Sequence, residues 1–295
     1  MKKNHEGSAR VGIVAILTIA LVGLTLLSEA PVVASATTPQ LDCKGGTCPS
    51  ASVALANGNN KKTTLPHVTV TTTSSTPLIV AIITANSVVT IAAGDVNASG
   101  TTMSAECAAS GSTDIVAVYY LAVSGTSTLV ESGVTTSSGG PGKFATIIAF
   151  GVSGYASSNT FDGPCGTTGG GATNPSLSIS GLLYGNDMVV GGVGVSGTSI
   201  TLTPSSGTSI TSVSPSTGYT ASASYIYGTG IGSYTVSWTA TGESSWQEAV
   251  FAIADSTPTS VPLFPEGIIP LVFAIPILYL MLVRRGRKAP KGVSI

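Results

Sequence analysis

Residues 144–150 read FATIIAF, and residues 187–195 read DMVVGGVGV. Both runs are almost continuously apolar, a pattern typical of strands that are buried on both faces of a sheet. Residues 233–238, SYTVSW, alternate instead, so that their Tyr, Val and Trp side chains share one face of a strand. Together the three runs predict a β-structure whose central strands are covered on both sides.

The same kind of sequence extends over residues 66–255, with turn signals at roughly 8–12-residue spacing, as in a sandwich or barrel. A region of about 190 residues is long enough to form one two-sheet core. We therefore predict an all-β fold, a two-sheet antiparallel sandwich, with the glycine-rich residues 163–171 as a loop. The predicted strands are residues 68–73, 78–85, 88–92, 115–123, 127–134, 144–152, 176–179, 188–195, 199–203, 220–227, 233–238 and 249–254.

Residues 1–36 have the organisation of a secretory signal peptide. Lys2, Lys3 and Arg10 precede the apolar residues 11–27, and Ala34-Ser35-Ala36 has the small-residue form of a cleavage site after Ala36. An uncleaved signal anchor is the alternative. In either case the positive end stays in the cytoplasm and the chain that follows is exported.

A second apolar segment, residues 267–283, reads GIIPLVFAIPILYLMLV and is followed by the basic sequence RRGRK. As a helix, its 17 residues would extend ~26 Å, at the short end of what crosses a bilayer. Because positive residues beside a span stay in the cytoplasm, the preceding chain should lie outside the cell. Both ends therefore predict the same topology, a single-pass protein of the cell membrane with an extracellular main domain.

Three further segments complete the predicted organisation. Residues 37–65 are rich in Thr, Asn, Gly and Ser and predict a low-complexity linker. Residues 256–266, STPTSVPLFPE, predict an extended Pro/Thr spacer that holds the domain off the membrane. Residues 284–295 form a short basic cytoplasmic tail.

The charge pattern excludes one class of partner. Only 8% of the 295 residues are charged, against about 25% in ordinary soluble domains. Residues 37–260 contain 10 acidic and 4 basic residues, which leaves this region with a net charge of −6. Nucleic-acid binding requires a basic surface, so we expect no nucleic-acid partner.

Four cysteines are present, an even number that predicts disulfides in an exported chain. Three pairings are possible, and we favour a local Cys43–Cys48 bridge with a Cys107–Cys165 bridge in the main domain. Buried free thiols are the alternative. The C-x4-C spacing without partner histidines does not indicate zinc.

One loop-like stretch carries two candidate sites. Asp95, Asn97, Ser99 and Glu106 occupy positions 1, 3, 5 and 12 of a calcium-loop pattern, with Gly100 at position 6. The alternative is a hairpin turn, because the neighbouring sequences indicate strands rather than helices. Asn97 also begins the chain's single N-x-[ST] sequon that lacks a proline, which predicts a glycosylation site in an exported loop.

No catalytic constellation stands out, and we expect no enzymatic activity and no cofactor apart from the calcium candidate. His67 is the single histidine of the exported region, and Glu243 with Glu248 is the one carboxylate pair close enough in sequence to consider for glycoside hydrolysis. Exposed aromatic residues would bind a sugar by stacking, although such residues more often pack in a core. The candidates for this stacking surface are Tyr219, Tyr225, Tyr227 and Trp246.

The runs VAVYYLAVSGTSTLV, FATIIAFGVSGYASSNTFDG, NPSLSISGLLYGNDMVVGGVGVSG and SYTVSWTATGESSWQEAVFAIA resemble a jelly-roll β-sandwich module of archaeal and bacterial surface proteins. The tail resembles a tripartite sorting signal, with Pro265-Glu266-Gly267 as its motif. The resemblance implies a jelly-roll fold and assigns no catalytic residue.

We therefore expect a membrane-anchored cell-surface protein with a structural or adhesive role. Its expected partners are the membrane, cell-surface glycans and neighbouring surface-layer proteins. A carbohydrate-binding module is the main alternative. A surface glycoside hydrolase and a self-assembling filament subunit, with residues 37–65 donating a strand, are the others.

Overall fold

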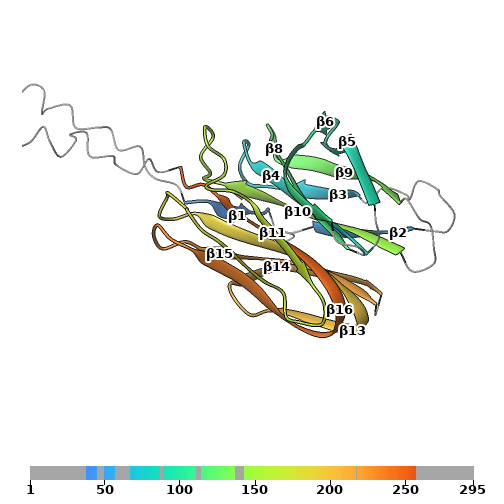
Figure 1. Ribbon diagram of the computed structural model, residues 1–295. Coiled ribbons are helices and arrows are strands. Elements are labelled where there is room, and N and C mark those ends of the chain that lie inside the picture. Colours follow the sequence, from blue (N-terminus) through green and yellow to red (C-terminus); the bar gives the residue numbers. More distant parts are fainter. Residues whose placement is uncertain are drawn as a thin grey trace, which may run out of the picture. The chain divides into compact units, whose positions relative to one another are not determined.

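The computed structural model describes residues 38–44, 50–56, 67–86, 89–110, 114–136, 143–216 and 218–256. In these ranges the chain is all β, and its strands pair antiparallel in three sheets (Figure 1). The predicted all-β class and antiparallel pairing are confirmed. The number of sheets differs from the two predicted, because a strand's apolar pattern shows that both its faces are covered but not by how many layers.

The central sheet has the order β1-β10-β4-β8-β7, and β2 pairs with β10 beside β1. Its strands are β1 (Gln40–Asp42), β2 (Ser50–Ala56), β4 (Leu78–Ala85), β7 (Ser104–Ser110), β8 (Ile115–Ala122) and β10 (Lys143–Ser153).

Another sheet has the order β11-β16-β13-β15-β14, and β12 pairs with β16. Here the strands are β11 (Gly166–Gly170), β12 (Ser176–Ile179), β13 (Met188–Pro204), β14 (Thr208–Ser216), β15 (Tyr219–Tyr227) and β16 (Tyr234–Ile253). The remaining sheet, in the order β3-β9-β5-β6, is smaller. It consists of β3 (His67–Thr71), β5 (Val89–Ala98), β6 (Thr101–Thr102) and β9 (Ser127–Thr136).

The central sheet is buried on both faces. In β4, Val80 and Ile82 belong to the core shared with the β13–β16 sheet, whereas Ile79 and Ile83 belong to the core shared with the β3–β9 sheet. Alternate side chains of one strand point to opposite faces of the sheet, so a single apolar run supplies side chains to both cores. The continuous apolar pattern of residues 144–150 has the same cause, since this part of β10 is buried between the two cores, apart from the half-buried Phe144 at its start.

A third core forms where the β13–β16 sheet folds back on itself. β13 pairs with β16 from Met188–Ile253 to Pro204–Trp238, with register shifts near Gly197. At this bend Gly242 has a φ of 76°, a conformation that glycine adopts without the strain a side chain would introduce.

Close packing at Gly191 shows how tightly the folded halves meet. A Cβ there would lie 2.6 Å from Val236 Cγ1 and 2.7 Å from the Trp238 ring. Distances under 3.0 Å are not tolerated without movement, so the absence of a side chain at this position lets the two halves of the sheet pack against each other.

Two predicted irregular segments contain strands. Residues 40–42 and 50–56, in the predicted linker, pair with β10. Residues 166–170, in the predicted glycine loop, form β11 and pair with β16. A Cβ at Gly170 would lie 2.6 Å from the Trp246 ring, so glycine is required here for packing and not for a turn.

Both predicted apolar segments, residues 11–27 and 267–283, lie outside the described residues. Within the described ranges no helix combines the length and the apolar character needed to cross a membrane.

Candidate functional site

Three aspartates that are distant in sequence meet at one end of the β13–β16 sheet. β13 begins where β15 and β16 end, because Met188 pairs with both Tyr227 and Ile253. Asp187 immediately precedes β13, and Asp255 follows β16. Asp162 follows Phe161, which forms an isolated bridge with Ile253. All three aspartates are buried, at 3% exposure or less, and we call them the carboxyl cluster.

The carboxyl cluster holds the loops at this end in place. Asp162 Oδ2 accepts hydrogen bonds from the backbone N–H groups of Leu183 and Tyr184, at 2.5 and 2.8 Å. Asp187 Oδ1 accepts one from the backbone N–H of Asp255 at 2.9 Å. The backbone carbonyl of Asp187 accepts a further one from Gly228 at 2.8 Å. A buried carboxylate is stabilised by such N–H donors, and here they tie four chain segments together.

Burial perturbs the ionisation of Asp187. Its Oδ2 is buried and accepts no hydrogen bond from a described donor. Burial, followed by the nearby Asp162 carboxyl, raises the pKa of Asp187 to about 7. At neutral pH the Asp187 carboxyl is therefore protonated in a substantial fraction of the molecules.

Among the residues that the structure describes, no group of three or more His, Cys, Asp or Glu side chains is arranged to hold a metal ion.

The carboxyl cluster lies where the described domain begins and ends. Gln40, at the start of β1, pairs with Ser153, and Asp255 forms a bridge with Tyr155, two residues further along the chain. In Figure 1, β1 and the red end of the ribbon accordingly lie near each other. The chain thus enters and leaves this domain at the same end.

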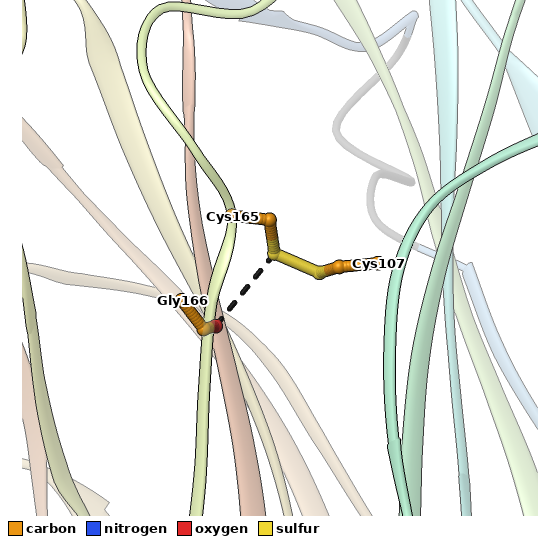
Figure 2. Close-up of a disulfide and its surroundings, with 3 residues drawn as sticks. All are labelled: Cys107, Cys165 and Gly166. Atoms are coloured by element: carbon orange, nitrogen blue, oxygen red, sulfur yellow. Dashed lines mark hydrogen bonds between the residues drawn. A yellow bond between two sulfur atoms is a disulfide. The ribbon is translucent and has the colours of Figure 1, made fainter.

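A disulfide links the central sheet to the segment that leads into β11. Cys107 on β7 and Cys165, just before β11, are bridged with a Cα–Cα distance of 6.0 Å (Figure 2). This confirms the predicted Cys107–Cys165 pair. The dashed line in Figure 2 joins Cys165 Sγ to the Gly166 carbonyl at 3.6 Å. A bridged sulfur carries no hydrogen, so we treat this approach as a contact. Cys48 lies outside the described residues, and the Cys43–Cys48 bridge stays a prediction.

Three residues of the calcium-loop pattern, Asp95, Asn97 and Ser99, lie on a β-hairpin. β5 and β6 pair through Asn97–Thr102 and Ala98–Thr101, and the turn residues Ser99 and Gly100 have φ values of 48° and 83°. Positive φ at both positions matches the two-residue turns that connect twisted strands.

Two oxygens of the pattern accept hydrogen bonds from backbone N–H groups. Asn97 Oδ1 accepts one from Gly100 N at 3.2 Å, and Ser99 Oγ accepts one from Leu129 N at 3.1 Å. Asp95 is also on β5, whereas Glu106 is on β7, and burial raises the pKa of Glu106. Calcium at these four residues and a glycan at Asn97 stay predictions.

The catalytic candidates predicted from the sequence lie in different surroundings. His67 is exposed at the start of β3 and pairs with Glu131. Glu243 pairs with Gly197 at the bend of β16. Glu248 is fully buried within the folded sheet, and neither of its carboxyl oxygens has a described hydrogen-bond partner. Burial raises the pKa of Glu248 to about 8, so this side chain is largely protonated at neutral pH.

The predicted aromatic surface does not form as one surface. Tyr219 and Trp246 are buried in different cores, so these two candidates are wrong as sugar-stacking residues. Tyr225 and Tyr227 form an edge-to-face pair with ring centroids 5.3 Å apart, and Tyr227 is the more exposed of the two. Packing in a core, the alternative considered from the sequence, explains Tyr219 and Trp246 better.

The carboxyl cluster was not predicted from the sequence. Asp187 and Asp255 each lie beside a strand boundary, and this position is the one sequence feature that could have indicated the cluster. The signal becomes informative only when the pairing of β13 with β16 is known, because the two residues are 68 positions apart. Comparison of the chain with protein-family models, with curated proteins and with solved structures finds no match.

Proposed function

We propose that this protein is a membrane-anchored, exported protein that displays its β-domain at the cell surface in a structural or adhesive role. The observation that carries the proposal is the meeting of Gln40 and Asp255 at the two ends of the Ser153–Tyr155 segment. A domain whose chain enters and leaves at one end can present the opposite end outward. The chain would then leave the domain on the side of the membrane that holds the predicted span at residues 267–283.

The Cys107–Cys165 disulfide supports the exported location. Structural disulfides persist in oxidising compartments and are rare in the cytosol. This bridge closes a loop of 58 residues between β7 and the segment before β11, an arrangement suited to a structural bond. The jelly-roll topology suggested by the sequence resemblance, and helices at the two apolar ends, belong to the same proposal.

The chemical character of the domain also fits display at a surface. Its charge is low, and many exposed strand positions carry Ser or Thr, as in β14 with TSITSVSPS. In the proposed arrangement, the spacer of residues 256–266 joins the domain to the span at residues 267–283, and the disulfide and the three cores keep the displayed domain rigid.

Topology is the property to test first. We would insert a site-specific protease sequence between Gly171 and Ala172, in an exposed loop far from the carboxyl cluster, in the full-length chain. A matched variant would carry the same sequence after Lys288. In intact cells, protease should cleave the first variant and spare the second until the membrane is permeabilised. Cleavage of the second variant alone in intact cells would refute export of the domain.

A further inference from the structure

Large apolar side chains are exposed at few described positions, and most of these lie at one end. Among the described residues, the large hydrophobic side chains that are exposed are Leu129 (37%), Leu183 (64%), Tyr227 (42%) and Ile231 (75%). The last three lie at the carboxyl-cluster end. Leu183 is in the segment before β13, Tyr227 ends β15, and Ile231 is in the following loop.

These side chains are carried by loops of defined structure. The Asp162 carboxylate accepts a hydrogen bond from the backbone N–H of Leu183. The backbone carbonyl of Asp187 accepts one from the N–H of Gly228. The loop around Ile231 is also held by Tyr234, whose hydroxyl accepts a hydrogen bond from Thr229 N at 2.9 Å and donates one to the Gly230 carbonyl at 2.6 Å. Their exposure is therefore a property of ordered loops.

The two loops are neighbours in space. A Cβ at Gly185 would lie 3.9 Å from Gly230 Cα, so residues 180–187 and residues 228–233 approach each other closely. We call these two segments, together with Tyr227, the docking loops. Single exposed apolar side chains are common on protein surfaces, whereas several that are carried by neighbouring loops fit an interaction site.

We propose that the docking loops are a membrane-contacting face, which places Leu183, Tyr227 and Ile231 in the headgroup region of the bilayer that holds the C-terminal span. This inference rests on the proposed function, because it needs the span at residues 267–283 to be in a membrane. The partner is argued from where the chain leaves the domain. The last described residue, Ser256, follows directly after Asp255 of the carboxyl cluster.

The spacer length makes this contact a specific claim. Residues 257–266 separate the described domain from the predicted span, and at ~3.1 Å per extended residue they reach about 30 Å. A domain without affinity for lipid would use this length and stay away from the surface. The amphipathic ring of a tyrosine favours the interface, and burying leucine and isoleucine side chains there removes apolar area from water.

The test uses the full-length protein reconstituted in phosphatidylcholine vesicles, with and without brominated acyl chains. Bromine quenches nearby indole emission, and the native Trp238 and Trp246 are buried. We expect that Ile231→Trp and Leu183→Trp each lose most of their added emission in brominated vesicles. The matched control Thr173→Trp, in the exposed loop at residues 171–174 far from the docking loops, should lose none.

Vesicle flotation separates the two levels of the argument. If the chain floats with the vesicles but Ile231→Trp and Leu183→Trp are quenched no more than Thr173→Trp, the docking face is refuted and the membrane anchor stands. If the chain does not float, both proposals fail. Unchanged melting temperatures in the three variants would show that folding is intact, as expected for exposed positions.

Discussion

At the scale of single residues, two buried carboxyls have raised pKa values and so link folding to pH. Asp187 and Glu248 are fully buried, and each has at least one oxygen without a described hydrogen-bond partner. The raised pKa values, about 7 for Asp187 and about 8 for Glu248, mean that the folded state binds their protons more tightly than the unfolded chain does.

We expect the free energy of unfolding to fall as the pH rises from about 5 to about 8. A raised carboxyl pKa stabilises the folded state below the unfolded pKa, which is 3.8 for Asp187 and 4.5 for Glu248. This stability is lost as the pH rises through the folded value. The slope should be at most about 1.4 kcal/mol per pH unit for each proton. Urea unfolding at pH 5, 6, 7 and 8 measures it.

Two isosteric variants assign that slope. Asp187→Asn should flatten the part below pH 7, and Glu248→Gln should flatten the part that extends to pH 8. Wild-type stability that is equal at pH 5 and pH 8 would contradict the protonated state that we describe for both side chains.

At the scale of elements, the disulfide is the covalent connection between β7 and the segment that leads into β11. Closing a loop of 58 residues restricts the unfolded chain, which in the chain-entropy description stabilises the fold by about 4 kcal/mol. We expect the double variant Cys107→Ala/Cys165→Ala to unfold with a free energy lower by ~2–4 kcal/mol, measured by urea denaturation. Reduction of the wild-type protein should lower the stability by a similar amount. A variant as stable as the oxidised wild type would show that the bridge has no structural role.

Strands with apolar side chains could be predicted from the sequence alone. β4 and β12 match residues 78–85 and 176–179, because each is bounded by turn-forming residues. The single strands β13 and β16 were each predicted as two pieces, since the alternation is lost at the bend near Gly197 and Gly242.

Strands without an apolar pattern were missed. β11 is mostly glycine, and glycine ordinarily weakens a strand. Glycine is needed in this strand because the large side chain of Trp246 occupies the space that a side chain at Gly170 would fill. β14 is largely Ser and Thr with a single buried residue, Ile210, so its period is not visible in hydrophobicity. The carboxyl cluster was missed for a related reason, since it depends on which strands pair.

At the scale of the whole described domain, the central sheet couples the other two. Ile147 on β10 packs in the core shared with the β3–β9 sheet, whereas Ile148 on the same strand packs in the core shared with the β13–β16 sheet. One strand therefore contributes to two cores, and we expect the three layers to unfold together.

The variant Ile147→Ala tests this coupling, because it should destabilise the domain by ~2–5 kcal/mol. Trp238 and Trp246 report from the third core, which Ile147 does not contact. The unfolding transition followed by their emission should nevertheless shift to a lower urea midpoint. That midpoint should equal the one measured by far-ultraviolet circular dichroism. Leu129→Ala, at a partly exposed position on β9, is the control and should change little. Two separate transitions would contradict a single cooperative unit.

The shared position of the first and last described strands has a consequence for protein engineering. Because Gln40 pairs with Ser153 and Asp255 forms a bridge with Tyr155, the described domain begins and ends at neighbouring points. A host protein needs only a narrow gap in a surface loop to carry such a domain as a guest. Residues 38–256 are therefore suited to grafting between two strands of an unrelated scaffold, and equally to recircularisation with new termini elsewhere.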